Sequence, residues 1–220
     1  LKLKSCERFL GIDREDRFTG GELIEVYFEW QKTKVPALLD TLLLHNAEDI
    51  ANLPNLLSLL RYRALPHSDF QLRAHERDEC TIHLHYLSTL ALPQPMDLRG
   101  DFWALHAEGS AVELYVQLFE GERKLFFADF EHYYYLPAED QVIHQSLAEF
   151  VDRSARKKAC ARNCYQRVSG CFLPECSEVY TPALQAEYRD KLRYAQYSDA
   201  LFDDEAKAVT YLKSFLETAL

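Results

Sequence analysis

The sequence predicts an α+β fold, in which N-terminal helices precede an antiparallel β-meander with flanking helices. Three observations support this prediction. Residues 1–62 repeat apolar side chains at intervals of three and four, as amphipathic helices do. Residues 79–136 contain short segments rich in β-branched and aromatic residues, which are typical of strands. From residue 138 to residue 220 the pattern is helical again, so we expect two domains, 1–62 and 63–220.

The first expected elements are a short helix, a polar loop and a second helix. The loop is the turn-rich segment GIDREDRFTGG, residues 11–21. In the following segment, ELIEVYFEWQKT, one apolar face contains Leu23, Val26, Tyr27 and Trp30. Acidic residues near its start and Lys32 near its end suit the helix dipole, so this segment is predicted to be helical.

A long helix is expected from Pro36, because a proline in the first helical turn loses no hydrogen bond. Its apolar residues go almost all the way round. We therefore expect neighbours on several sides and a core larger than the first 60 residues can supply. Pro54 should kink or split this helix near residues 50–53, because its ring opposes the carbonyl group four residues earlier.

Four segments in the middle of the chain are predicted to be strands: CTIHLHYL, DFWALHA, AVELYVQLFE and RKLFFADF. FEGERK, residues 119–124, is the expected hairpin turn between the last two. After Pro137, the segment AEDQVIHQSLAEFVDRSARKKACARN is expected to form one long helix. The last segment, DDEAKAVTYLKSFLETAL, should form a capped terminal helix.

Charge limits the partners of the chain. The formal net charge of −10 opposes broad attraction to the phosphate backbone of nucleic acids. A local exception is the basic segment DRSARKKACARNCYQR, Asp152 to Arg167, for which a solvated helix face is the favoured interpretation.

No apolar run approaches the roughly 18 residues of a membrane span, and the first residues lack a signal-peptide pattern. We therefore expect a cytoplasmic protein with no membrane partner. The chain begins LKLKSCERF, without an initiator methionine, so we expect it to be part of a longer protein.

Two polar residues interrupt an apolar row of the long helix. Positions 38, 42, 45, 49, 53, 56 and 60 lie on one row, where His45 and Asp49 replace leucine. An interior carboxylate normally acquires a cation, a metal or several hydrogen-bond donors. Periodicity alone favours an internal His45–Asp49 pair, or a rotated helix with both side chains in solvent. The family resemblance of this region instead favours a functional pair.

That resemblance covers about the first 60 residues. It consists of an LGI-R-D loop at residues 10–16, a glycine pair at residues 20–21 before the helix with Glu22, and an HN-ED element at residues 45–49. In this order the features resemble the closing segment of a ribonuclease H-like, DEDD-type 3′–5′ exonuclease domain of the YprB kind.

In that superfamily, four acids bind two divalent metal ions, Mg²⁺ or Mn²⁺, which hold the scissile phosphate and activate a water molecule. The resemblance implies that Asp49 is the last metal ligand. It also implies that His45 positions or deprotonates the attacking water. The four-residue separation is that of the tyrosine-type members, although the residue here is histidine.

Two other motifs of the family have no counterpart in the sequence: an Asp-x-Glu on a central strand, and a helix containing Asn and Asp. One carboxylate cannot hold two Mg²⁺ ions, so this chain alone is expected to be inactive as a nuclease. The missing acids would lie upstream in the full protein, or the nuclease half has been lost.

Other candidate ligands are more scattered. Four cysteines lie close together, Cys160, Cys164, Cys171 and Cys176, and could hold zinc, but their spacing favours four reduced thiols. His83 and His85 alternate on one face of a predicted strand, which permits shared ligation. No third ligand is recognisable, so a half-exposed strand face is the favoured interpretation.

These features support two functions. The first is the C-terminal portion of a metal-dependent 3′–5′ exonuclease acting on nucleic acid, followed by an accessory domain. The alternative is a non-catalytic module that binds nucleic acid or a protein partner through the Arg153–Arg167 segment and the neighbouring aromatic run FFADFEHYYYLP, residues 126–137. For that run, a packed join between sheet and helix is the favoured interpretation.

Overall fold

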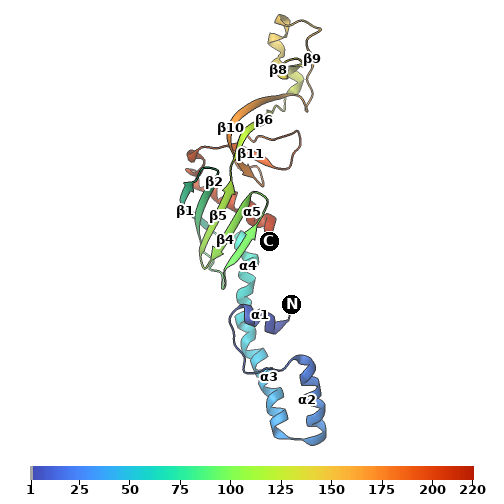
Figure 1. Ribbon diagram of the computed structural model, residues 1–220, viewed down its shortest axis with the longest axis vertical. Coiled ribbons are helices and arrows are strands. Elements are labelled where there is room, and N and C mark those ends of the chain that lie inside the picture. Colours follow the sequence, from blue (N-terminus) through green and yellow to red (C-terminus); the bar gives the residue numbers. More distant parts are fainter. Residues whose placement is uncertain (1) are drawn as a thin grey trace.

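The chain has an elongated shape, with its N-terminal helices at one end and its sheets along the remaining length (Figure 1). The computed structural model describes residues 2–220. The chain is α+β, with helices first and antiparallel sheets after them, as the sequence predicts. The α-helices are α1 (Leu3–Phe9), α2 (Gly20–Thr33), α3 (Pro36–Leu56), α4 (Leu60–Ala64) and α5 (Glu205–Ala219). Among residues 2–220, no helix is long and apolar enough to span a bilayer.

The strands form three sheets. The first has five strands in the order β1-β2-β5-β4-β3, the second has the order β11-β10-β6, and the third has the order β8-β7-β9. Their bounds are β1 (Phe70–Arg77), β2 (Thr81–Ser88), β3 (Met96–Arg99), β4 (Trp103–Glu108), β5 (Ala111–Gln117), β6 (Phe119–Phe126), β7 (Tyr133–Leu136), β8 (Gln141–His144), β9 (Lys157–Lys158), β10 (Tyr165–Glu175) and β11 (Arg193–Gln196).

The first three helices form close to their predicted positions. α2 begins with a capping box, in which the Thr19 hydroxyl accepts from the Glu22 amide and the Glu22 carboxylate accepts from the Thr19 amide. Lys34, at φ 56°, ends α2 in the left-handed conformation, and Pro36 starts α3. α2 and α3 therefore form a hairpin at one end of the molecule (Figure 1).

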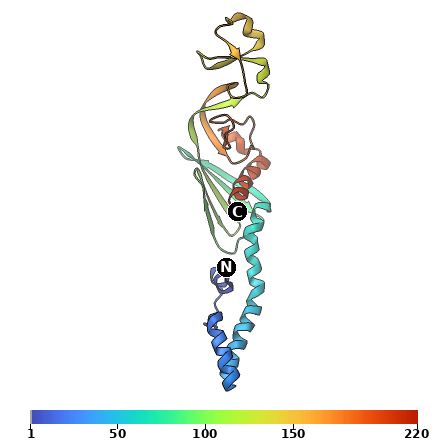
Figure 2. The same ribbon diagram turned by 90° about the vertical axis from the view of Figure 1, so that its right-hand side faces the viewer.

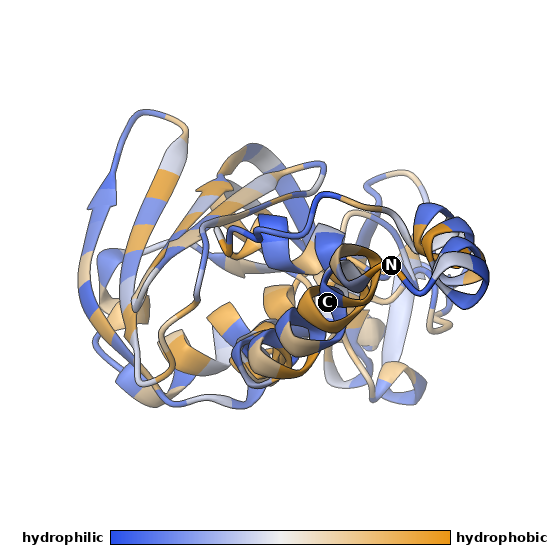
Figure 3. Cartoon of the chain, turned by 90° about the horizontal axis from the view of Figure 1, so that it is seen from below, coloured by the Kyte–Doolittle hydropathy of each residue, from blue (hydrophilic) through white to orange (hydrophobic). Residues whose placement is uncertain are grey.

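The long helix α3 differs from the prediction in two ways. It continues through Pro54 to Leu56 before it tightens into a 3₁₀ turn, so the break follows the proline instead of preceding it. In the described chain α3 packs on α1, α2 and the loop between them, and within Pro36–Leu56 no side chain is buried. Exposed apolar side chains on α3, the 3₁₀ turn after it and the start of α4 are Leu43, Leu44, Ile50, Leu53, Leu57 and Leu60. Figure 3, seen from this end, shows hydrophobic residues on the helices and along the strands.

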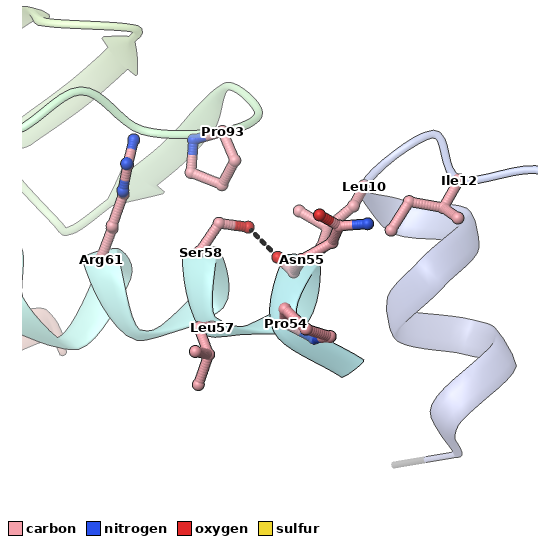
Figure 4. Close-up of a pocket in the computed structure, with 8 residues that line it drawn as sticks. All are labelled: Leu10, Ile12, Pro54, Asn55, Leu57, Ser58, Arg61 and Pro93. Carbon is pink, nitrogen blue, oxygen red and sulfur yellow. Dashed lines mark hydrogen bonds between the residues drawn. The ribbon is translucent and has the colours of Figure 1, made fainter. Parts of the chain in front are cut away.

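Polar contacts attach the helical end to the first sheet. Arg61 donates to the Ala91 carbonyl at 3.0 Å. The Tyr62 hydroxyl donates to the Gln94 carbonyl at 2.8 Å and accepts from the Gln94 amide at 3.1 Å. A hollow of about 550 Å³ lies beside this joint, with Pro93 on the sheet side (Figure 4). The contact between α4 and the first sheet therefore has specific hydrogen bonds, but a hollow remains beside it.

The main core lies between the five-stranded sheet and α5 (Figure 2). Alternate residues of β2, including Ile82 and Leu84, point into this core, as the period of two in a strand requires. The Tyr86 hydroxyl donates to the Ala208 carbonyl of α5 at 2.9 Å. On β2 the residues between these, such as His83 and His85, therefore point to the opposite face of the sheet.

The predicted strands are present, but the turn in FEGERK is wrong. β6 runs straight through this segment and pairs with β10, where Gly121 lies opposite Gly170. A Cβ atom on Gly121 would lie 2.9 Å from the Phe119 ring, so this glycine makes room for an aromatic side chain within a strand. The order is also not a simple meander, because β5 pairs with β2 and β4, and β1 and β3 were not predicted.

The expectation of helices throughout residues 138–220 is also wrong. Among the described residues of this region, α5 is the only α-helix, and it confirms the predicted terminal helix. In place of the long helix, Val142 and Ile143 pair with Tyr135 and Tyr134 in a hairpin whose turn contains Asp140 at φ 49°. β-branched and aromatic residues favour such cross-strand pairs. The like charges at positions 153 and 157 would oppose one another in a helix.

Candidate functional site

The loop between α1 and α2 lies against α3 and carries charged residues to it. Glu48 on α3 holds this loop, because its carboxylate accepts from the backbone amides of Glu15 at 2.7 Å and Asp16 at 3.1 Å. Backbone hydrogen bonds and an ion pair with Arg14 lower the pKa of Glu48 against the opposing effect of burial. We use the name charged cluster for the six residues gathered here: Glu7, Arg14, Asp16, His45, Glu48 and Asp49.

Arg14 is the centre of the charged cluster. Its side chain is 6% exposed, and its Nη1 lies 2.9 Å from Glu7 Oε2. Its Nε lies 3.2 Å from Glu48 Oε2, and its Nη2 lies 2.6 Å from Asp49 Oδ1. Burial alone would lower the pKa of Arg14, but these carboxylates outweigh burial and raise it. The guanidinium group therefore joins α1, the loop and α3 in one ionic network.

Asp16 is a buried and fully engaged carboxylate. Its Oδ2 lies 2.6 Å from both Lys4 Nζ and His45 Nδ1, and its Oδ1 accepts from the Phe18 amide at 2.9 Å. Burial would raise the pKa of Asp16, but the hydrogen bonds from His45, Lys4 and the Phe18 amide hold it well below its usual range. Asp16 is therefore an ionised structural partner, with little capacity for a further ligand.

His45 has its two ring nitrogens in different surroundings. Nδ1 lies 2.6 Å from the ionised Asp16, so in the neutral tautomer that donates to Asp16 the acceptor nitrogen is Nε2. Nε2 lies 3.4 Å from Oδ2 of Asp49, one helical turn further along α3. An imidazole oriented by a carboxylate in this way can take a proton from a water molecule at its free nitrogen.

Asp49 is the carboxylate of the charged cluster with free binding capacity. Its side chain is 33% exposed. Oδ1 lies 2.6 Å from Arg14, but the approach lacks hydrogen-bond geometry, and within residues 2–220 this atom has no hydrogen-bond donor. Oδ2 faces His45 Nε2 at 3.4 Å. By contrast, Glu7 accepts hydrogen bonds from Arg14 and from Asn52.

The charged cluster fits one edge of a divalent-metal site. Its four carboxylates outnumber the basic groups that contact them, Arg14 and Lys4, so a further cation would be attracted. Carboxylate oxygen is the ligand that Mg²⁺ prefers. Among the described residues, however, the other three carboxylates already accept several hydrogen bonds, so Asp49 is the ligand that this segment can offer.

The structure brings His45 and Asp49 together on α3, and their roles as base and metal ligand stay predictions. The sequence did not assign roles to Arg14 and Asp16, although both belong to the LGI-R-D loop. Their contacts with α3 join residues about 30 positions apart. A local pattern of apolar residues cannot predict contacts over such a separation.

The four clustered cysteines do not form a ligand set within residues 2–220. Cys160 is exposed, whereas Cys164 is buried. Burial raises the pKa of Cys164 and of Cys176 to about 11, so both thiols are protonated at neutral pH. The geometry agrees with four reduced thiols and gives no support for zinc at this place.

The basic segment and the aromatic run lie together at the end of the molecule opposite α2. Arg156 and Lys158 lie 4.9 and 5.0 Å from the centre of the Tyr134 ring. Tyr133 stacks on Phe127 at 5.2 Å. The expected join between sheet and helix is wrong, because the run forms β7 and a 3₁₀ turn within a small three-stranded sheet.

Comparison with known proteins gives a match at the N-terminus. Residues 1–61 match a family model, RNase_H_2, which is described as RNase_H superfamily. The matched segment contains every member of the charged cluster. Comparisons with curated proteins and with solved structures give no match. Residues 1–61 are therefore similar to the RNase H superfamily, and the region that follows is described by its structure.

Proposed function

We propose that the N-terminal region, residues 1–62, is the closing segment of a metal-dependent 3′–5′ exonuclease domain of the YprB kind, and that residues 63–220 form an accessory domain. The observation that carries the proposal is the pair His45 and Asp49. It combines an imidazole oriented by Asp16 with the partly exposed carboxylate of Asp49, inside the segment that matches the ribonuclease H superfamily.

Asp49 would hold Mg²⁺ or Mn²⁺ together with acids supplied by the rest of the nuclease domain. The bound metal ions supply charge stabilisation of the phosphate and a more acidic water molecule. Arg14 holds Oδ1 of Asp49 and so sets the orientation of the carboxylate. Oδ2 is left on the side of His45.

His45 would accept the proton of the attacking water at Nε2. Asp16 is the positioning residue, because it fixes the tautomer of His45 and stabilises the imidazolium ion that the proton transfer creates. Lys4 in turn holds Asp16 at 2.6 Å. Proton transfer and metal binding would therefore use neighbouring atoms of one helical turn.

The exposed apolar side chains of α3 and the 3₁₀ turn after it support a larger domain. Ile50, Leu53 and Leu57 are each more than half exposed, although a helix with apolar residues almost all round is normally covered. In the proposal, the sheet of the ribonuclease H-like domain covers this face and brings the missing acids to Asp49. The 220-residue chain by itself is then expected to be inactive.

A cleavage assay tests the proposal. The longest natural polypeptide that contains this sequence should degrade 5′-labelled RNA or DNA from its 3′ end, and only with added Mg²⁺ or Mn²⁺. Asp49→Asn should reduce the rate by at least about 100-fold. Asp40→Asn, the same change at an exposed site of α3, is the matched control and should leave the rate unchanged. Undiminished cleavage by Asp49→Asn would overturn the assignment.

A second candidate function is binding through the other end of the molecule. The observation in its favour is the combination of exposed Lys157 and Lys158 with the exposed apolar side chains Leu147 and Phe150. In that case the 220-residue chain should bind single-stranded nucleic acid with an affinity that falls steeply with salt. Replacement of both lysines by glutamine should weaken binding and flatten this salt dependence. A chain that binds no nucleic acid at low salt would exclude this candidate, leaving a protein partner.

A further inference from the structure

The open face of the five-stranded sheet carries a cluster of histidines and a glutamate. Ile82 and Leu84 of β2 point into the core, so His83 and His85 point to the opposite face. β5 is the neighbouring strand, and in its register Glu113 lies opposite His85 and Tyr115 lies opposite His83. The third candidate ligand therefore comes from a strand about 30 residues away.

The three side chains are close enough to share one ion. His83 Nε2 lies 3.8 Å from one carboxylate oxygen of Glu113, and His85 Nδ1 lies 3.7 Å from the other. One ligand atom from each residue can be chosen so that all three lie within 4.8 Å of one another. Two ligands of a tetrahedral zinc ion are about 3.3 Å apart, given bonds of about 2.0–2.1 Å, so small side-chain rotations complete the geometry.

One ring nitrogen of His83 lacks a hydrogen-bond partner in the described part of the chain. Its Nε2 is buried and has no hydrogen-bond partner among residues 2–220. A buried nitrogen without a partner is costly, and a metal ion would satisfy it.

Tyr115 holds the cluster in place. Its ring stacks on the His83 ring at 3.9 Å, with an angle of 19° between the planes. Its hydroxyl donates to Glu113 Oε2 at 2.8 Å. Hydrogen bonds of this kind orient ligating carboxylates in metal sites. Tyr115 therefore fixes both a ligand ring and the ligand carboxylate.

We propose that His83, His85 and Glu113 bind one Zn²⁺ ion on the open face of the first sheet. Two imidazoles and one carboxylate are a ligand set that zinc favours, and they leave a fourth position for water or an external ligand. The side chains are 24–34% exposed, so the ion can enter from solvent. The site is formed by the first sheet and is separate from the charged cluster on α3.

Zinc titration of the tag-free 220-residue chain tests this proposal. Calorimetry should show one Zn²⁺ bound per chain, and His85→Ala and Glu113→Gln should each weaken binding by at least about 100-fold. The matched control is His106→Ala. His106 lies opposite Glu113 on β4, on the same open face, but its Nδ1 is paired with Asp97 at 2.9 Å. This variant should bind zinc as the unchanged chain does.

Two further measurements make the result decisive. Circular dichroism in EDTA should show that each variant keeps the fold, since all these positions are solvent-accessible. Co²⁺ in place of Zn²⁺ should give visible absorption bands of a four-coordinate ion, and the bands should disappear in His85→Ala. The proposal would be overturned by a chain that takes up no zinc, by equal affinity in His85→Ala and the unchanged chain, or by binding that thiol alkylation abolishes.

Discussion

Oδ2 of Asp16 lies 2.6 Å from Nδ1 of His45, and Asp16 comes from the loop before α2 whereas His45 lies in the middle of α3. The contact gives the imidazole a defined orientation. It also makes the geometry at Asp49 depend on a loop that is held by Glu48 and Arg14. Stability of the loop and chemistry of the α3 pair are therefore linked.

Asp16→Asn should destabilise the N-terminal region at neutral pH. We expect the free energy of unfolding to fall by about 2 kcal/mol, because hydrogen bonds to a buried charged group are lost. The pKa of Asp16 is lowered in the folded state, so its contribution is present above the usual pKa of an aspartate and disappears as the pH falls through the folded-state value. Urea unfolding followed by circular dichroism should show the two proteins converging in acid. A constant difference at all pH values would contradict this explanation.

Arg14→Met should be more damaging, because it leaves the buried carboxylates of Glu7 and Asp16 without their shared cation. We expect a loss of about 3 kcal/mol or more, since an unpaired buried charge is costly. Arg17→Met is the control, at an exposed position of the same loop, and should change stability by less than about 0.5 kcal/mol. Hydrogen exchange of α1 and α3 amides measures the effect locally. Equal protection in the two variants would show that Arg14 does not join these helices.

Ile50→Glu should distinguish the 220-residue chain from the longer polypeptide. Ile50 is 74% exposed, so in the chain alone the change should alter stability by less than about 0.5 kcal/mol. In the longest natural polypeptide the same residue is proposed to be covered by the nuclease sheet, and a buried glutamate there should cost more than about 2 kcal/mol. Thermal unfolding of both pairs measures the contrast. If Ile50→Glu left the thermal stability of both the 220-residue chain and the longer polypeptide unchanged, this face of α3 would not be covered.

Glu175 should make the stability of the sheet region depend on pH. Its side chain is fully buried, and its Oε1 accepts from the amides of Val179 and Tyr180. Burial raises its pKa from 4.5 to about 7. Because the folded state holds its proton more tightly, stability should fall by up to about 3 kcal/mol as the pH rises from 4.5 to 7.

Glu175→Gln removes this titration while it keeps an acceptor for the two amides. The variant should match the unchanged chain near pH 5 and exceed its stability at pH 8. Urea unfolding monitored by tryptophan fluorescence measures both, since Trp103 packs against Phe215 in the same core. Glu217→Gln, at an exposed position of α5, should not alter the slope with pH. Parallel pH profiles for wild type and Glu175→Gln would refute the predicted titration.

The sequence predicts local features of this chain better than contacts between distant segments. The spacing of His45 and Asp49 places them on one turn of α3, and the structure agrees. The sequence could not predict that Asp16 lies beside them, because a loop has no repeating pattern that indicates which residues it contacts. Glu113 likewise reaches His85 only through strand pairing, and β3 and β4 lie between these strands in the sequence.

The largest error concerns residues 138–163, where many residues favour helices. Ala, Arg, Glu, Gln, Lys and Leu make up more than half of this segment, and these residues have high helix propensity. The pairing of Val142 and Ile143 with the tyrosines of β7 outweighs that propensity. Tertiary contacts decide such segments, and the aromatic partners lie outside the window in which periodicity is judged.

The most direct test of the account is the position of a metal ion beside α3. Crystals of the longest natural polypeptide, soaked with Mn²⁺ as a substitute for Mg²⁺, should give an anomalous peak about 2.1 Å from an oxygen atom of Asp49, with His45 Nδ1 still bonded to Asp16. Asp49→Asn crystals should lack this peak. Occupied metal positions elsewhere, with Asp49 contacting only Arg14 and His45, would contradict the account.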